Sequence, residues 1–152
     1  MVNWVFNGNH NWNFEAINNA QGTDAMYLTF SEDYKGDKVL PFIVGIYTML
    51  IKAHGGKKEF YLFDSVDPQL LYNASRNIET AVWKLSNAKD SSGKSFLLAN
   101  EINEKESNLS FEREFGKIIG RTDFLAFTLS EKTERSITRI IQNVTTGLFI
   151  PI

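Results

Sequence analysis

The chain has 152 residues, a typical length for one domain and enough to bury a hydrophobic core without a metal or a disulfide. Hydrophobic residues make up 43% and charged residues 22% of it, and a formal net charge of −2 argues against general binding to nucleic acid. The absence of cysteine excludes disulfides, thiolate nucleophiles and thiolate metal sites. We therefore expect residues 1–152 to form a single globular domain.

The sequence also bears on location. The N-terminal residues lack the basic and apolar pattern of a signal peptide. The longest apolar run, residues 39–51, is shorter than the roughly 20 residues that a membrane-spanning helix needs. We expect a soluble, cytoplasmic protein that does not bind membranes.

Residues 1–20 allow two interpretations. In one, Asn7-Gly8-Asn9 is the loop of a hairpin that places the aromatic residues between Trp4 and Phe14 on one face. In the other, which we prefer, residues 3–6 form a strand and residues 14–20 a short helix. Residues 26–30 are expected to form the next strand.

Residues 39–51 are also ambiguous. As a helix they have Asp37 as N-cap, Pro41 in the first turn and a basic C-terminal end before Gly55. As a strand they are rich in β-branched and aromatic residues, and Gly55-Gly56 would turn them into a hairpin with residues 58–64. We favour the helix.

The second half alternates helical patterns with short apolar runs. The clearest helix begins at Asp67-Pro68 and ends near Ala88. Ser110 begins another helix, which Gly120 ends, and Ser130 caps a third, which Gly147 ends. The apolar runs typical of strands are residues 58–64, 95–99, 123–129 and 148–152.

This alternation predicts the fold class. Strands separated by helices of about 10 residues or more are typical of βαβ units and a parallel sheet. The apolar runs are continuous, as expected for strands that are covered on both faces. We therefore predict an α/β domain with a mostly parallel sheet flanked by helices. The alternative is an α+β domain with an antiparallel hairpin near Gly55-Gly56.

A parallel sheet would gather the residues that follow its strands. Such sheets bind ligands beyond the carboxyl ends of their strands. Capping preference alone explains many small polar residues at these places, but the cluster as a whole suggests a ligand site. The predicted ligand-binding residues are Asn9, His10, Ser31, Asp33, Ser65, Asn100, Glu101 and Ser130.

The candidate catalytic side chains are carboxylates and one histidine. His10 is a candidate general base, whereas His54 suits the last turn of a helix. Two histidines so placed do not predict a metal site. Two convergent carboxylates would support glycosyl transfer or hydrolysis, and a magnesium site is an alternative. The candidate catalytic carboxylates are Glu32, Asp64 and Glu131.

Two segments resemble TIR domains. Residues 27–33 read Tyr-Leu-Thr-Phe-Ser-Glu-Asp and look like the opening TIR strand and its first loop. Residues 122–130, a helix and residues 149–152 look like a later strand, helix and strand. The resemblance implies a flavodoxin-like fold that acts as a signalling adaptor or cleaves NAD, which makes NAD a candidate ligand. Related nucleoside deoxyribosyltransferase-like proteins cleave N-glycosidic bonds.

Two functions remain open at this point. The first is nucleotide-type ligand binding or N-glycosidic bond cleavage, with Ser31, Glu32, Asp64 and Ser130 lining one cleft. The second is a non-catalytic protein-interaction module, such as an adaptor, an immunity-type protein or a virion component. It rests on the aromatic N-terminus and on residues 137–142, which lack the Glu that TIR enzymes carry in the corresponding helix. The partner is then a nucleotide-like molecule or a protein, and the oligomeric state is open.

Overall fold

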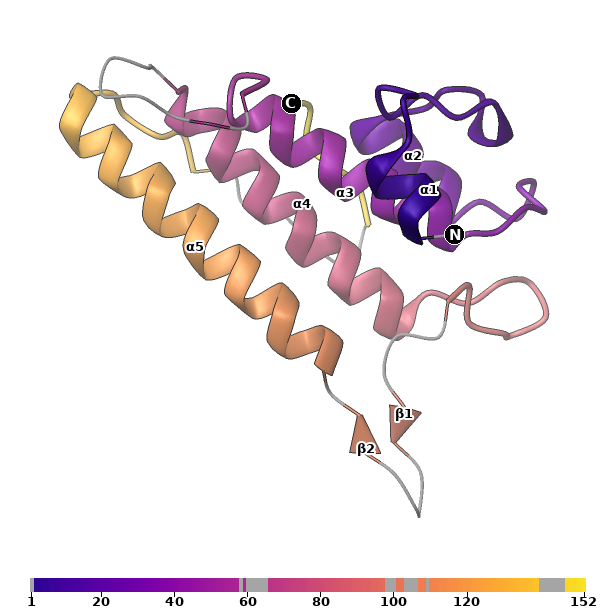
Figure 1. The fold of residues 1–152 in the computed structure, drawn as a ribbon. Helices are drawn as coiled ribbons and strands as arrows, with labels where there is room; N and C mark the ends of the chain where they lie inside the picture. The colour runs from indigo at the N-terminus through magenta and orange to yellow at the C-terminus, as the bar shows by residue number, and fades with distance from the viewer. Residues whose placement is uncertain are drawn as a thin grey trace.

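The computed structural model describes residues 2–57, 59, 66–97, 101–102, 107–108, 110–139 and 147–152, and these residues are mostly helical (Figure 1). The helices of the described residues are α1 (Val2–Asn7), the 3-10 helix η1 (Glu15–Ile17), α2 (Gly22–Thr29), α3 (Val39–Ala53), α4 (Pro68–Asn87) and α5 (Ser110–Thr133). A short antiparallel hairpin pairs β1 (Glu101–Ile102) with β2 (Ser107–Asn108).

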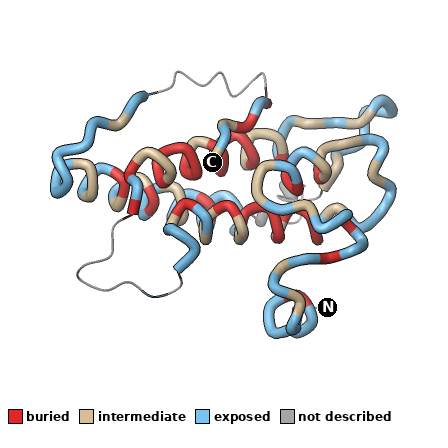
Figure 2. Tube along the Cα trace, turned by 90° about the horizontal axis from the view of Figure 1, so that it is seen from above, coloured by how far each residue is buried: buried red, intermediate tan, exposed pale blue. Residues whose placement is uncertain are grey.

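The helices pack in chain order. α2 lies against α3, α3 against α4, and α4 against α5, which runs beside α4 in the opposite direction (Figure 1). Buried positions follow the sides on which the helices face one another, and exposed positions follow their outer sides (Figure 2). None of the described helices combines the length and the apolarity that a membrane-spanning segment needs.

The prediction of an α/β domain with a mostly parallel sheet is wrong. The sheet that the described residues contain is the two-stranded hairpin of β1 and β2. The alternative hairpin at Gly55-Gly56 is not formed from residues 39–51, because they lie in α3. Residues 58 and 60–64, which were predicted to form a strand, lie outside the described residues.

The largest error concerns residues 110–133. Ser110 begins a helix as predicted, but the helix continues through Gly120, and the predicted strand of residues 123–129 is part of it. Phe115, Thr122 and Ala126 are buried on one side of this single helix. An interior glycine disfavours a helix by only about 1 kcal/mol relative to alanine, so packing of this side on α4 outweighs it.

Residues 26–30 are also helical rather than extended. Met26 and Thr29 are fully buried on α2, where α2 meets α3. A Cβ atom on Gly45 would lie 2.6 Å from Cγ of Met26, so glycine lets the two helices approach closely. The apolar run that resembled a strand is therefore the buried side of a short helix.

The N-terminal prediction is largely wrong. Residues 3–6 belong to helix α1, so they form neither the preferred strand nor one arm of the alternative hairpin. The short helix predicted over residues 14–20 is present only as the single turn of η1. Of the predicted strand at residues 95–99, Ser95 makes an isolated bridge to Lys89, and residues 98–99 lie outside the described residues.

The two helices with clear capping signals are confirmed. α3 covers residues 39–51, but its N-cap is Lys38 rather than the predicted Asp37; the Asp37 carboxylate lies one residue earlier and accepts a hydrogen bond from the backbone N–H of Val39 at 2.9 Å. α4 begins at Pro68, and Asp67 caps it by accepting from the N–H of Gln69 at 2.9 Å. A side-chain oxygen at these places satisfies a backbone donor that the first helical turn leaves unpaired.

The C-terminal segment lies along α4 without forming regular structure. Residues 135–139 and 147–152 form neither helix nor strand, which contradicts the predicted final strand and most of the described part of the helix predicted after Ser130; residues 131–133 are helical, but as the end of α5. The rest of that helix, residues 140–146, lies outside the described residues.

Three amide side chains on α4 hold this segment. Asn77, fully buried, accepts from the N–H of Ile150 at 2.6 Å and donates to its carbonyl at 2.8 Å. Asn73 donates to the carbonyl of Pro151 at 3.1 Å. Gln69 makes the same two-way contact with the backbone of Thr138, at 2.7 and 3.1 Å. We call Gln69, Asn73 and Asn77 the amide ladder, because their spacing of four residues places them on one side of α4.

We expect Asn77→Ala to lower the free energy of unfolding by about 2 kcal/mol. The substitution leaves the N–H and the carbonyl of the half-buried Ile150 without their partner, and the loss of a partner costs a buried group about 1–3 kcal/mol. Urea denaturation measures the change. The control is Asn87→Ala, which removes one exposed local bond to Trp83 from the same helix and should change stability by less than about 0.5 kcal/mol. Equal effects would contradict the role of the amide ladder.

Candidate functional site

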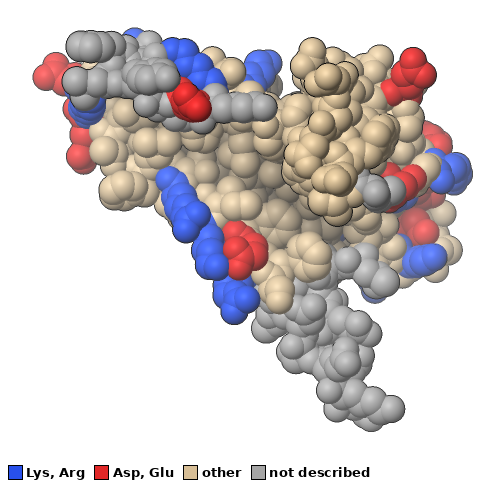
Figure 3. Space-filling view, viewed as in Figure 1, with Lys and Arg blue, Asp and Glu red and all other residues tan. Residues whose placement is uncertain are grey.

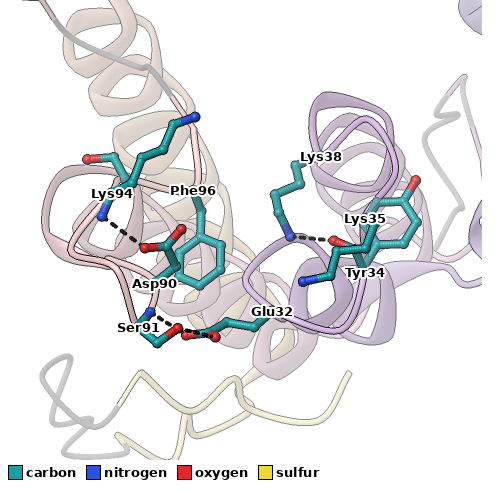
Figure 4. Close-up of a pocket in the computed structure, with 9 residues that line it drawn as sticks. Glu32, Tyr34, Lys35, Lys38, Asp90, Ser91, Lys94 and Phe96 are labelled. Carbon is teal, nitrogen blue, oxygen red and sulfur yellow. Dashed lines mark hydrogen bonds between the residues drawn. The ribbon is translucent and has the colours of Figure 1, made fainter.

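A pocket of about 300 Å³ lies between the loop after α2 and the turn after α4 (Figure 4). Both segments follow helix ends, so helix packing brings together residues that are far apart in the sequence. The lining residues are Glu32, Tyr34, Lys35, Lys38, Asp90, Ser91, Lys94, Ser95 and Phe96.

Asp90 shapes the turn that forms one wall. One of its carboxylate oxygens accepts from the Ser92 hydroxyl at 2.6 Å and from the N–H groups of Ser92 and Lys94, both at 2.9 Å. Gly93 follows with a φ of 83°, which glycine adopts without strain. The hydroxyl of Ser92 and these backbone donors hold the pKa of Asp90 below its usual range. Asp90 is therefore an ionised, structural acceptor.

Glu32 joins the two walls. Its Oε1 accepts from the N–H of Ser91 at 2.6 Å, and its Oε2 accepts from the Ser91 hydroxyl at 2.9 Å (Figure 4). The two residues are 59 positions apart in the sequence. Because both carboxylate oxygens hold the turn, Glu32 acts here as a tie between two loops.

Lysines and aromatic rings complete the pocket. The ammonium group of Lys38 donates to the carbonyls of Ser31 at 2.6 Å and Tyr34 at 3.0 Å, and lies 5.0 Å from the centre of the Phe96 ring. Burial lowers the pKa of Lys38, and the charge of Lys35 lowers it further. Burial and then the nearby Asp37 raise the pKa of Tyr34, which keeps its hydroxyl protonated. Cations beside flat rings suit an anionic ligand with an aromatic part.

His10 is not placed near this pocket but organises the N-terminal segment. Its Nδ1 accepts from the N–H of Trp12 at 3.0 Å, so Nε2 carries the proton and donates to the carbonyl of Trp4 at 2.9 Å. Its ring also contacts Phe14, with 4.1 Å between centres. Both nitrogens are engaged in this tautomer. Asn9 is exposed in the same loop.

Ser130 and Glu131 lie at the other end of the helix pair from Glu32. Ser130 does not cap a new helix; it lies in the last turns of α5 and donates to the carbonyl of Phe127 at 2.8 Å. Ser91, which binds Glu32, follows the end of α4, whereas α5 ends beside the start of α4 (Figure 1). A helix of 20 residues is about 30 Å long, so Ser31 and Glu32 share no cleft with Ser130.

The remaining predicted site residues divide into two groups. Ser31 and Asp33 flank Glu32, and the Ser31 hydroxyl accepts from the N–H of Asp33 at 3.2 Å. Asp64, Ser65 and Asn100 lie outside the described residues, and for Glu101 only the backbone, in β1, is described. The pocket residues that the sequence did not identify are Tyr34, Lys35, Lys38, Asp90, Ser91, Lys94, Ser95 and Phe96.

A second candidate site is the side of α5 that points away from α4. Phe124 is 73% exposed in the middle of this helix. Phe127, one turn later, is 38% exposed and lies at the edge of this side, because its ring also contacts Tyr72 of α4 with 6.3 Å between centres. Basic side chains line part of the same surface, as the stripe along α5 in Figure 3 shows. We call the exposed residues that share this side the outer face of α5: Arg113, Lys117, Gly120, Phe124, Phe127 and Glu131.

Comparison with known proteins does not assign either site. No family model matches the chain, and neither a curated protein nor a solved structure is significantly similar to it. Within the described residues, no three His, Asp or Glu side chains gather in a way that could hold a metal ion. Function must therefore be inferred from the pocket and from the outer face of α5.

We expect Glu32→Ala to loosen the turn after α4. A hydrogen bond to a charged acceptor contributes about 1.5 kcal/mol, so the N–H of Ser91 should exchange with solvent roughly tenfold faster. Hydrogen exchange followed by NMR measures this rate. Asp33→Ala is the control, because its side chain belongs to the same loop but does not line the pocket. Unchanged exchange at Ser91 in Glu32→Ala would show that the tie does not hold the turn.

Proposed function

We propose that this chain is a non-catalytic protein-interaction module that binds its partner through the outer face of α5. The observation that carries the proposal is the exposure of Phe124, at 73%, in the interior of the longest described helix. Burying a phenylalanine side chain contributes about 1.5–3 kcal/mol, which folding of one chain leaves unused here.

The composition of this face supports the same proposal. Aromatic residues and arginine are enriched among the residues that contribute most to binding at protein interfaces. The outer face of α5 has Phe124 and Phe127 near its centre and Arg113 and Glu131 at its two ends. An apolar centre with a charged rim is the usual arrangement of a protein interface.

The contacts of the candidate catalytic side chains give less support to a catalytic function. Glu32 uses both carboxylate oxygens on Ser91, and His10 uses both ring nitrogens on the backbone. A general acid or base must reach the proton of a bound substrate, and these groups are engaged elsewhere. Their contacts stabilise loops instead.

Photo-crosslinking tests the proposal. We expect p-benzoylphenylalanine at position 124 to form a covalent adduct with a protein when cells that produce the variant are irradiated, because the side chain lies in an interface. The control carries the same group in place of Val39, which is 47% exposed on α3. Mass spectrometry of the adducts identifies the partner. If positions 124 and 39 give the same products, the outer face of α5 is not an interaction surface.

The pocket supports a second candidate function, binding of a nucleotide-type ligand. Lys35 and Lys94 line it together with the rings of Tyr34 and Phe96, while Lys38 in the same wall donates to the carbonyls of Ser31 and Tyr34. Ammonium groups pair with phosphate oxygens, and flat rings stack on a base. The volume of about 300 Å³ is at the lower end for ligand pockets, so a mononucleotide fits this proposal better than a dinucleotide.

We expect AMP to raise the melting temperature by about 2–4 °C, which corresponds to about 1 kcal/mol of binding linkage, and NAD to raise it less. Lys35→Gln should remove most of the shift, whereas Lys132→Gln, at the far end of α5, should not. Thermal denaturation with each ligand measures the effect, and chromatography of the same samples detects release of a base. No shift with AMP, NAD or phosphate would remove this candidate.

A further inference from the structure

The outer face of α5 has a regular spacing. Its residues follow one another in steps of four, three, four, three and four along the sequence. Alternation of three and four keeps side chains on one stripe of a helix and is the spacing of helices that pack along their length. α5 has 24 residues and is therefore about 36 Å long. The stripe thus offers a second helix a long, continuous contact.

We infer that the occupant of this face is a second copy of the chain, with the two α5 helices packed antiparallel around a two-fold axis. The inference rests on the proposed function and names its partner. In a two-fold interface each contact occurs twice with the roles exchanged, so the face must be complementary to itself. With the axis level with residue 122, Gly120 faces Phe124 of the other copy, and Arg113 faces its Glu131.

Size complementarity is the first reason to expect a second copy on this face. A Cβ atom added at Gly120 or Gly116 would meet nothing within 4 Å, so both glycines leave open space on the surface of α5. In the same register, Phe124 of the second copy lies over Gly120, and its Phe127 comes within one residue of the level of Gly116. One large ring, Phe124, thus meets a position without a side chain, and this contact occurs twice; Gly116 leaves further open space next to the level of Phe127.

Charge complementarity is the second reason. Arg113 and Lys117 lie near the start of α5 and Glu131 near its end, and all three are exposed. Antiparallel packing pairs Arg113 with Glu131 at both ends of the interface. Parallel packing would bring Arg113 against Arg113 and Glu131 against Glu131, which is repulsive. The charges therefore select the antiparallel arrangement.

The ion pairs that Arg113 and Lys117 make within the chain leave both side chains available for contacts with a second copy. Arg113 and Lys117 pair with Glu114 at 3.7 and 2.8 Å, but exposed pairs of this kind contribute little and rearrange easily. In the register above, Lys117 comes level with Phe127 of the second copy. That ring already has Tyr72 at 6.3 Å and Arg139 at 5.8 Å from its centre, so Lys117 of the second copy would approach the part of the ring that remains exposed. One helix pair is a small interface, so we expect dimerisation to depend on concentration.

Sedimentation velocity over a range of concentrations tests the inference. We expect the wild type to form dimers and Phe124→Ser to remain monomeric, because the variant lacks the ring that packs over Gly120 of the second copy. The control is Val39→Ser, which removes an exposed apolar side chain from α3 and should dimerise like the wild type. Circular dichroism confirms that each variant folds; the substituted side chains are exposed, so the helices should be retained.

Charge reversal tests the register. Arg113→Glu and Glu131→Arg should each weaken the dimer by about tenfold, because each places like charges at both ends of the interface. The double variant R113E/E131R should restore the affinity, because it exchanges the charges of every pair. Restoration is specific to the antiparallel contact and does not follow from a general effect on solubility.

Each contrary result overturns a defined part of the inference. A wild type that is monomeric at every concentration excludes the second copy, and an adduct of position 124 with a different protein would then retain the proposed function alone. A dimer that survives Phe124→Ser uses another surface. A double variant no better than the single ones excludes the antiparallel register. Absence of both the dimer and any adduct at position 124 removes the proposed function as well.

Discussion

Buried amides on α4 are the constraint on which the rest of the structure depends. A backbone N–H or carbonyl that is removed from water must find a partner, and a segment outside helices and strands has none of its own. Asn73 and Asn77 supply these partners to Pro151 and Ile150, and Gln69 adds a contact with the exposed Thr138. These bonds hold the C-terminal segment along α4, which also contacts α3 and α5. α5 has one side against α4 and a second side that faces away (Figure 1).

Local sequence signals were sufficient to predict helices α3 and α4 but not to predict the length of α5. Asp67 caps α4, and Asp37 accepts from the first N–H of α3, each through a contact within two residues that a single sequence reveals. Gly120 was interpreted as a helix end because glycine is frequent there, although it also occurs in the interior of helices that pack well. With Gly120 as a helix end, the apolar residues after it match a buried strand, and that error contributed to the predicted parallel sheet together with the other short apolar runs. A short apolar run does not distinguish a strand from one side of a helix.

The pocket could be predicted only in part for a related reason. Glu32 was identified as a candidate because it is an acidic residue after an apolar run, but its partner Ser91 lies 59 residues away. No local pattern pairs the two positions, since their proximity follows from how α2, α3 and α4 pack. Ser130 failed in the opposite way: its residue type suits a cap, yet the helix does not end before it. Asn77 gave no signal either, because an amide in an amphipathic stretch is normally exposed.

Gly120 bears both on the wrong fold prediction and on the proposed dimer. At the end of a helix a glycine is favourable, but in the interior it disfavours the helix by about 1 kcal/mol relative to alanine, and α5 contains both Gly116 and Gly120. Neither glycine permits a close contact within the chain, because a Cβ at either would meet open space. Gly45 differs, since α2 approaches it so closely that a Cβ would clash. Gly45 is thus explained by packing within one chain, whereas Gly116 and Gly120 acquire the same explanation only if a second helix approaches α5 from outside.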